Sequence, residues 1–233
     1  PPDLADTLPA AVLYLMRRGG LLVEQDGFLR STVRFASIGD RLYAHDAFPT
    51  TAADSVFFGP DTYRFVAAIR RHLRPCEQLV DLCCGSGAGG LEAAHDQAKQ
   101  VVLADINPKA LDFAESTKGL IKEDAERAKK LLDDAGWKVG ADGIPYLADP
   151  LARAYRDGGG DLGTGLSIRI VREALARLAP GGQLLLYTGT PIVDGLDRFA
   201  AEALPLAHAA HAAVVYEEID PDVFGDELAN PAY

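Results

Sequence analysis

Residues 80–90 read Val-Asp-Leu-Cys-Cys-Gly-Ser-Gly-Ala-Gly-Gly, and residues 101–107 read Val-Val-Leu-Ala-Asp-Ile-Asn. The short apolar run at Leu79–Cys83 predicts a buried parallel strand, and the glycines after it predict a tight turn that can approach a ligand closely. Ala88–Ala98 is predicted as the next helix, and Val101–Ala104 as a second strand that ends at an acid. This order of elements is typical of α/β sheets that bind a nucleoside-containing cofactor.

The composition narrows the class of the protein. At 233 residues, 48% of them hydrophobic, the chain is long enough for one large domain or one domain with a small appendage. No apolar run approaches the roughly 18 residues of a membrane span, so no membrane partner is expected. Three cysteines, two of them adjacent, form neither a disulfide framework nor a metal-ligand spacing. We therefore expect no metal and a reducing, cytoplasmic location.

The net charge of −11 bears on the choice of partner. Binding to a phosphate backbone needs clustered Lys and Arg, and here the basic residues are scattered. The densest basic group, between Arg64 and Arg74, is interpreted as a solvated helix face rather than as a docking patch for RNA or protein. A nucleic-acid substrate is therefore possible but has no support from charge.

The chain before the glycine loop predicts a small appendage. Residues 4–18 have a helical pattern that stops at Gly19-Gly20. Short antiparallel strands are predicted next, at Leu21–Glu24, Phe28–Ser37 and Arg41–Ala44. We interpret residues 1–54 as a helix-plus-β-hairpin appendage, with packing or homo-oligomer formation favoured over substrate recognition, and residues 55–233 as the main domain.

The main domain is predicted to be a Rossmann-like α/β fold with a doubly wound, mostly parallel sheet, because helices and strands alternate along it. The predicted helices lie at residues 61–74, Pro108–Thr117, Leu166–Leu178 and Leu196–His208, and further strands lie at Gln183–Tyr187 and Ala213–Glu218. One segment conflicts with this fold. The architecture needs strands after residue 117, yet the apolar spacing and i,i+4 charge pairs of Ile121–Ala135 predict one amphipathic helix.

Two motifs indicate which class of cofactor the chain binds. By spacing alone, Gly85-x-Gly87-x-x-Gly90 also satisfies the dinucleotide fingerprint, with an acid about 20 residues further on. Asp81, however, lies inside the end of the strand, where its carboxylate can reach the ammonium of a ligand rather than a pyrophosphate. Together, Val80–Gly87 and Ala104–Pro108 resemble the S-adenosylmethionine-binding motifs of the class I methyltransferases.

Further matches narrow the branch of that family. Phe58–Thr62, Gly159–Leu166 and Ala179–Gly182 are similar to segments of the glutamine and nucleobase amino methyltransferases. The resemblance implies S-adenosylmethionine as the cofactor. It also implies methyl transfer to an amide or amino nitrogen of a protein or a nucleobase, which would be the partner.

The resemblance also assigns roles to residues of the two motifs. Asp81 and the Gly85/Gly87 loop would hold the methionine end of the cofactor. Asp105 would accept hydrogen bonds from the ribose hydroxyls, and Ile106 would flank the adenine. Asp61 is explained equally well as the N-cap of its helix. The full predicted cofactor set is Asp61, Thr62, Asp81, Cys83, Gly85, Gly87, Asp105, Ile106 and Asn107.

The substrate motif matches only in part. In this branch an Asn/Asp-Pro-Pro-Tyr motif holds the attacking amino group, and this chain has Gly143-Ile144-Pro145-Tyr146 at that place. Pro145 and Tyr146 match and are predicted to be catalytic, whereas Gly143 has no side chain to orient the nucleophile. A scaffold that at most binds the cofactor is therefore an alternative. A nicotinamide-dependent oxidoreductase is less favoured, since no Tyr/Lys or His constellation is suitably spaced.

Lys122–Ile144 also resembles a helix-and-loop segment of the periplasmic oligopeptide-binding proteins. On this basis residues 117–144 are interpreted as a possible graft, which would make the chain a chimera.

Overall fold

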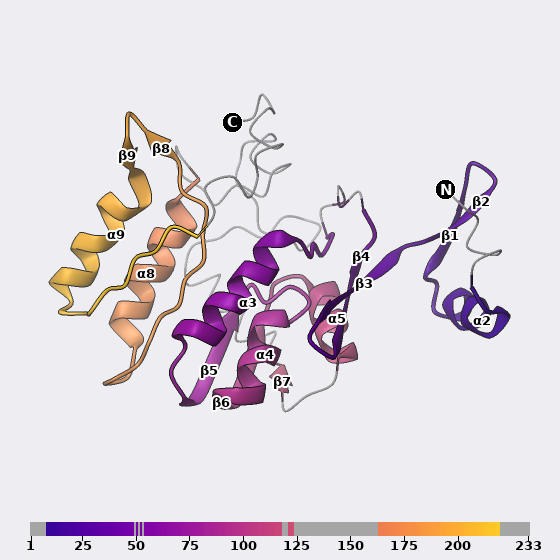
Figure 1. Ribbon diagram of the computed structural model, residues 1–233, viewed down its shortest axis with the longest axis horizontal. Coiled ribbons are helices and arrows are strands. Elements are labelled where there is room, and N and C mark those ends of the chain that lie inside the picture. The colour runs from indigo at the N-terminus through magenta and orange to yellow at the C-terminus, as the bar shows by residue number, and fades with distance from the viewer. Residues whose placement is uncertain are drawn as a thin grey trace.

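The computed structural model has a mixed α/β architecture (Figure 1). It describes residues 8–48, 50, 52, 54–117, 121–123 and 163–219, with the backbone alone at 121–123. None of the helices in these ranges is long and apolar enough to cross a membrane.

The main sheet consists of the parallel strands β5 (Cys76–Leu82), β6 (Ala98–Ala104) and β7 (Ile121–Glu123), in the order β5-β6-β7. The central strand β6 is the most buried, and its Val101 and Leu103 are fully shielded from water. Such a continuous apolar run suits a strand that is covered on both faces. Both strands predicted around the glycine loop are present, but β5 is not buried in the described structure, where Val80 and Leu82 are 48% and 44% exposed. It also ends at Leu82 and leaves Cys83 in the turn.

Residues 121–123 form a strand where the local pattern predicted a helix. In β7, Ile121 is aligned with Val101 of β6 and Glu123 is aligned with Leu103. The helix predicted from Ile121 is therefore wrong at its start, because pairing with the edge of β6 outweighs local helix propensity. Its remaining residues, 124–135, lie outside the described part of the chain.

Three helices accompany the sheet: α3 (Pro60–His72), α4 (Ala88–Asp96) and α5 (Pro108–Ser116). Helix α4 begins directly after the glycine loop and packs on β6, and α3 packs on α4 (Figure 1). Asn107 caps α5 by accepting the backbone N–H of Lys109 at 3.1 Å. All three predicted helices are confirmed, but the N-cap of α3 is Gly59 and not Asp61.

Gly90 allows α4 to approach the sheet closely. A Cβ atom at this position would lie 2.3 Å from Cδ2 of Leu103, 3.0 Å from Cγ1 of Val101 and 3.1 Å from Cβ of Asp81. Gly90→Ala is therefore expected to lower the free energy of unfolding by about 1–3 kcal/mol, the usual cost of overpacking a core. Urea unfolding measures this change. Gly189→Ala is the matched control, since a Cβ there meets no described residue within 4 Å; equal stability of both variants would contradict the close packing.

Two hairpins precede the sheet. The first pairs β1 (Leu22–Gln25) with β2 (Phe28–Ser31), and the second pairs β3 (Val33–Ile38) with β4 (Arg41–Asp46). The single strand predicted at residues 28–37 is thus divided at Thr32 between two separate sheets. Asp26 and Gly27 both have positive φ, as the two-residue turn of the first hairpin requires.

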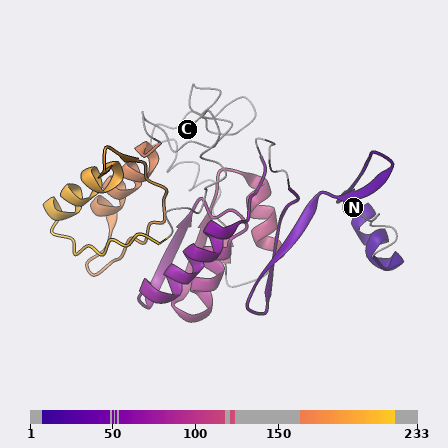
Figure 2. The ribbon, with the colours of Figure 1, turned by 45° about the horizontal axis from the view of Figure 1, so that its top comes forward.

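The two hairpins have different surroundings (Figure 1 and Figure 2). The second shares one hydrophobic core with the parallel sheet, where Ile38 and Tyr43 join Leu91 and Leu103. In contrast, α2 (Ala10–Arg18) buries none of its residues and stands with the first hairpin away from the sheet in both views. The second hairpin therefore belongs to the main core, and a domain boundary after residue 54 stays a prediction.

The C-terminal described region contains α8 (Gly165–Arg177) and α9 (Arg198–Ala209), both as predicted. A short hairpin of β8 (Ile192–Val193) and β9 (Leu196–Asp197) lies between them in the sequence. The helices pack against each other through a cluster that is separate from the main core.

The strands predicted at Gln183–Tyr187 and Ala213–Glu218 are wrong for the described structure, in which neither segment is assigned to a strand. Leu184 and Leu186 nevertheless pack against the cluster between α8 and α9. An apolar run can pack against helices without forming a strand, because a strand also needs a neighbouring ladder of hydrogen bonds.

Candidate cofactor site

The turn after β5 has an unusual backbone conformation. Three alternating residues, Cys83, Gly85 and Gly87, have φ angles of +58°, +54° and +79°. Glycine adopts such angles at little cost, whereas a residue with a side chain is strained. A Cβ atom on Gly87 would lie 2.9 Å from Leu103, while one on Gly85 would meet, among the described residues, only Val56, at 4.0 Å. The loop is therefore packed tightly at Gly87 and is open to close approach at Gly85.

Asp81 lies at the end of β5, partly buried beneath the first turn of α4. Its Oδ2 accepts the backbone N–H of Gly90 at 2.8 Å. Desolvation of the carboxylate raises the pKa of Asp81 to about 6, and Asp105 raises it as well, against the opposing effect of the Gly90 hydrogen bond. Within the described ranges no basic side chain forms an ion pair with Asp81. A cationic ligand group beside this carboxylate would offset its desolvation.

Asp105 follows β6 on the other side of the loop. Its Oδ2 accepts the N–H of Gly85 at 2.9 Å, and its Oδ1 accepts the N–H of Asn107, also at 2.9 Å. One carboxylate thus fixes the glycine loop and the chain that leads into α5. The amide of Asn107 donates to the carbonyl oxygen of Asp54 at 2.7 Å, so this predicted ligand already uses its side chain within the protein.

Cys83 is exposed in the turn and Cys84 is buried behind it, and the acids beside them disfavour ionisation of both thiols. Desolvation and then the carboxylates of Asp105 and Asp81 raise the pKa of the Cys83 thiol to about 12. Burial likewise raises the pKa of Cys84. A thiol that stays protonated is a weak nucleophile and a poor metal ligand, and the described residues contain no side-chain cluster that could hold a metal ion.

Asp61 and Thr62 belong to the first turn of α3. The hydroxyl of Thr62 accepts the N–H of Gly59 at 3.5 Å. Oδ1 of Asp61 is buried and has no hydrogen-bond partner among the described residues. An unsatisfied buried carboxylate oxygen is costly, and the ammonium or hydroxyl group of a ligand would satisfy it.

Helix α3 reaches the same region as Asp81. A Cβ atom on Gly89 would lie 2.9 Å from Phe65 of α3 and 3.2 Å from Oδ2 of Asp81. The first turn of α4 therefore contacts both α3 and the acid at the end of β5, and a larger residue at position 89 would separate them.

Most of the predicted cofactor residues gather at the carboxyl ends of β5 and β6, the usual ligand edge of a parallel sheet. They are Asp81, Cys83, Gly85, Gly87, Asp105, Ile106 and Asn107. The predicted catalytic residues Pro145 and Tyr146 lie outside the described residues. Sequence reasoning missed Val56, because it belongs to an irregular segment that carries no periodic signal.

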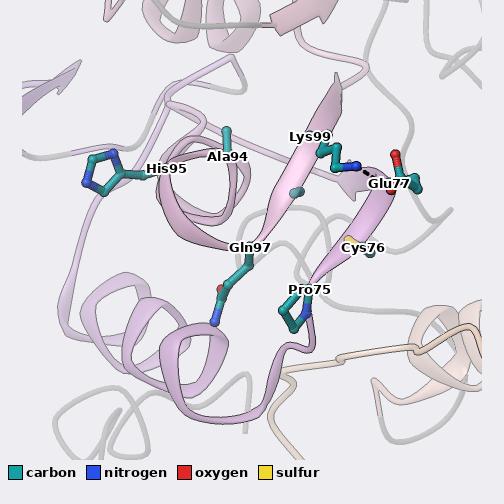
Figure 3. A pocket seen from close by; sticks show the side chains of 8 residues that line it. Pro75, Cys76, Glu77, Ala94, His95, Gln97 and Lys99 are labelled. Carbon is teal, nitrogen blue, oxygen red and sulfur yellow. Dashed lines mark hydrogen bonds and ion pairs between the residues drawn. The ribbon is translucent and has the colours of Figure 1, made fainter.

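A surface hollow lies at the opposite end of the strands. Figure 3 shows its lining residues, which are Pro75, Cys76, Glu77, Ala94, His95, Gln97, Ala98 and Lys99. It borders the amino ends of β5 and β6, where the exposed pair Lys99 and Glu77 lies 2.6 Å apart. Exposed ion pairs of this kind add little stability, and the hollow contains none of the predicted cofactor residues.

Comparison with curated proteins finds a partial methyltransferase relative. The chain is 30% identical over 143 residues to the release factor glutamine methyltransferase of Borreliella burgdorferi, which covers 53% of this chain and 49% of the relative. The chain therefore spans about half the length of the curated relative it matches. No protein-family model matches the chain. The similarity supports a methyltransferase in general and gives the chimera with a periplasmic binding protein no support.

Solved structures show more distant likenesses. Trm5b from Pyrococcus abyssi matches with a TM-score of 0.34 and 16% identity, over 44% of this chain and 33% of that chain. TYW2 from P. horikoshii, in complex with MeSAdo, matches with a TM-score of 0.32 and 18% identity, over 49% of this chain and 45% of that chain. Likenesses at this level do not establish a shared fold.

Proposed function

We propose that this chain is part of an S-adenosylmethionine-dependent methyltransferase that transfers a methyl group to an amide or amino nitrogen of a protein glutamine or a nucleobase. The observation that carries the proposal is the acidic set around the glycine loop. Asp81 and Asp105 lie on either side of it, and their carboxylates accept the backbone N–H groups of Gly90 and Gly85. The similarity to a glutamine methyltransferase supports the same cofactor and the nitrogen acceptor.

The charge of the site distinguishes the candidate cofactors. S-adenosylmethionine carries a sulfonium and an ammonium, and both cations are stabilised beside carboxylates. The pyrophosphate of a nicotinamide dinucleotide would instead approach Asp81, whose negative charge repels it. The acidic site at the glycine loop therefore favours S-adenosylmethionine over the nicotinamide dinucleotide of an oxidoreductase.

Asp81, Gly85 and Asp105, called the cofactor cradle below, each have a role in this proposal. Asp81 pairs with the ammonium of the methionine end, and the open backbone at Gly85 lets the cofactor approach. Asp105 accepts hydrogen bonds from the ribose hydroxyls while its bonds to Gly85 and Asn107 hold it in place. The bound cofactor supplies a methyl group on a positively charged sulfur.

The methyl acceptor is assigned from sequence resemblance. Pro145 and Tyr146 are proposed to hold the planar amide or amino group, with Tyr146 stacking on it. The doubly wound Rossmann-like sheet is the corresponding proposal for the fold, of which β5, β6 and β7 supply three parallel strands.

Calorimetric titration tests the proposal directly. S-adenosylmethionine and S-adenosylhomocysteine are expected to bind saturably, and reduced nicotinamide dinucleotide is expected not to bind. Absence of binding by both adenosyl compounds would overturn the proposal. Binding without methyl transfer to glutamine peptides or nucleobases would instead favour the non-catalytic scaffold.

The pH dependence of cofactor binding provides a second test. The pKa of Asp81 is about 6 in the folded protein, above its ordinary value of 3.8, so its contribution to stability is full below pH 3.8 and is lost as pH rises through 6. A cation binds the ionised carboxylate, and the dissociation constant is therefore expected to fall about tenfold from about pH 5 to about pH 7. Calorimetry across this range measures the effect. In Asp81→Asn, binding should be weaker and should lose this dependence; an unchanged pH profile would contradict the role of Asp81.

A further inference from the structure

Residues 54–58 form an irregular segment that lies against the glycine loop. Cγ1 of Val56 would be 4.0 Å from a Cβ atom on Gly85, and no other described residue comes within 4 Å of that position. Val56 and Phe58 are buried, at 3% and 8% exposure. A segment without its own helix or strand is held in place by its neighbours, and these contacts determine the shape of the cradle over Gly85.

Asp46, the last residue of β4, is one of these neighbours. It is 8% exposed, and its Oδ2 accepts the N–H of Val56 at 2.6 Å. Its own N–H donates to the carbonyl oxygen of Val56 at 3.1 Å. Its Oδ1 lies 2.7 Å from Nζ of Lys109, in the first turn of α5. One buried carboxylate thus joins the hairpin, the segment and the helix that follows β6.

Asn107 holds the same segment from the cofactor side. Its amide donates to the carbonyl oxygen of Asp54 at 2.7 Å, and its backbone N–H donates to Asp105 at 2.9 Å. The segment at 54–56 is therefore held by Asp46 at one point and, through Asn107, by the acid that is proposed to bind the ribose. Loss of either attachment would change the position of Val56 relative to Gly85.

We propose that Asp46 is a positioning residue of the cofactor site: it fixes Val56 over the glycine loop and, through its ion pair with Lys109, joins the hairpin to α5. The inference rests on the proposed function. It gives the second hairpin a role beyond packing, because the last residue of this hairpin sets the shape of a cradle built by residues far along the chain.

The two ends of β4 supply a matched pair of variants. Asp46→Ala removes the acceptor for Val56 and the partner of Lys109, and the dissociation constant for S-adenosylhomocysteine is expected to rise about tenfold, the usual effect of a misplaced binding element. Arg41→Met acts at the start of the same strand, where Arg41 donates to the carbonyl oxygen of Leu91 at 2.9 Å. It is expected to lower stability while leaving the dissociation constant within about twofold.

Asp46→Asn tests the two contacts separately. The asparagine keeps an oxygen for the N–H of Val56 but loses the charge that pairs with Lys109, so affinity should be recovered in part. It also keeps the test decisive if Asp46→Ala does not fold. Equal dissociation constants for the wild type and both Asp46 variants would overturn the inference and leave the proposed function standing, whereas no binding by the wild type would overturn both.

Amide hydrogen exchange without cofactor provides an independent readout. In the Asp46 variants, exchange is expected to accelerate at residues 54–58 and 85–87 relative to the wild type, and Arg41→Met should not change it there. Acceleration confined to the β3–β4 hairpin would mean that Asp46 only stabilises the hairpin, which would overturn the inference.

Discussion

Glu92→Ala is expected to lower the free energy of unfolding by about 2–4 kcal/mol, because a buried hydroxyl would lose its acceptor and a cavity would be left. Glu92, on α4, is only 6% exposed. Its Oε1 accepts the hydroxyl of the fully buried Tyr43 at 2.5 Å, and its Oε2 pairs with Arg70 at 2.5 Å. Arg41 of β4 lies 3.6 Å from Oε1. One carboxylate therefore connects the β3–β4 hairpin with α3 and α4.

The expected loss of stability in Glu92→Ala follows from the groups that would lose their partner. Tyr43 is 0% exposed, and without Glu92 its hydroxyl would be buried with no acceptor. Burial and then the Glu92 hydrogen bond raise the pKa of Tyr43, so the hydroxyl stays protonated and remains a donor. Alanine would also leave a cavity between the hairpin and α4.

Urea unfolding measures this effect, with the slope of the transition checked for constancy. Arg70→Met is the matched control, because the Arg70 side chain is 52% exposed and its ion pair is screened by solvent. The control should change stability by less than about 1 kcal/mol. If Glu92→Ala were as stable as the control, the network would not hold the hairpin to the core.

Asp105→Ala is expected to weaken binding of S-adenosylmethionine by about 100-fold or more, because two charge-assisted hydrogen bonds to the ribose would be lost at about 1.5–3 kcal/mol each. The loss has a second source within the protein. Asp105 accepts the N–H groups of Gly85 and Asn107, both at 2.9 Å, so its removal also frees the glycine loop. Calorimetry on folded protein, verified by circular dichroism, measures the affinity.

Asp105→Asn separates the two sources. It keeps one oxygen acceptor for the chain but loses the charge, and its affinity should lie between those of the wild type and the alanine variant. A loss of less than about threefold in Asp105→Ala would show that this acid does not hold the cofactor.

Local sequence patterns predicted the helices and the two strands around the loop correctly. Apolar runs, glycines and helix caps act over a few residues, and these local signals were sufficient to predict α4, α5, α8 and α9. The wrong predictions concern segments whose structure depends on a partner far away in the sequence. Ile121 became a strand because β6 offered an edge, and Gln183–Tyr187 is not a strand in the described structure, although Leu184 and Leu186 are packed against helices.

The same distinction between local and distant contacts applies to the candidate site. The residues Asp81, Gly85, Gly87 and Asp105 were identifiable from spacing, since each lies at or just after the carboxyl end of a parallel strand. The raised pKa of Asp81 could not be predicted from spacing, because it depends on desolvation by the folded core and on the nearby Asp105.

The sequence by itself determined the glycine loop, its flanking acids and the order of the neighbouring helices, because these depend on contacts between residues close in the chain. Only the tertiary structure decided which segments cover that loop. Asp46 precedes Val56 by ten positions and meets Lys109 through space. Glu92 meets Tyr43 from a separate element. Such contacts arise when hydrophobic burial brings the β3–β4 hairpin onto the parallel sheet, and no local pattern encodes them.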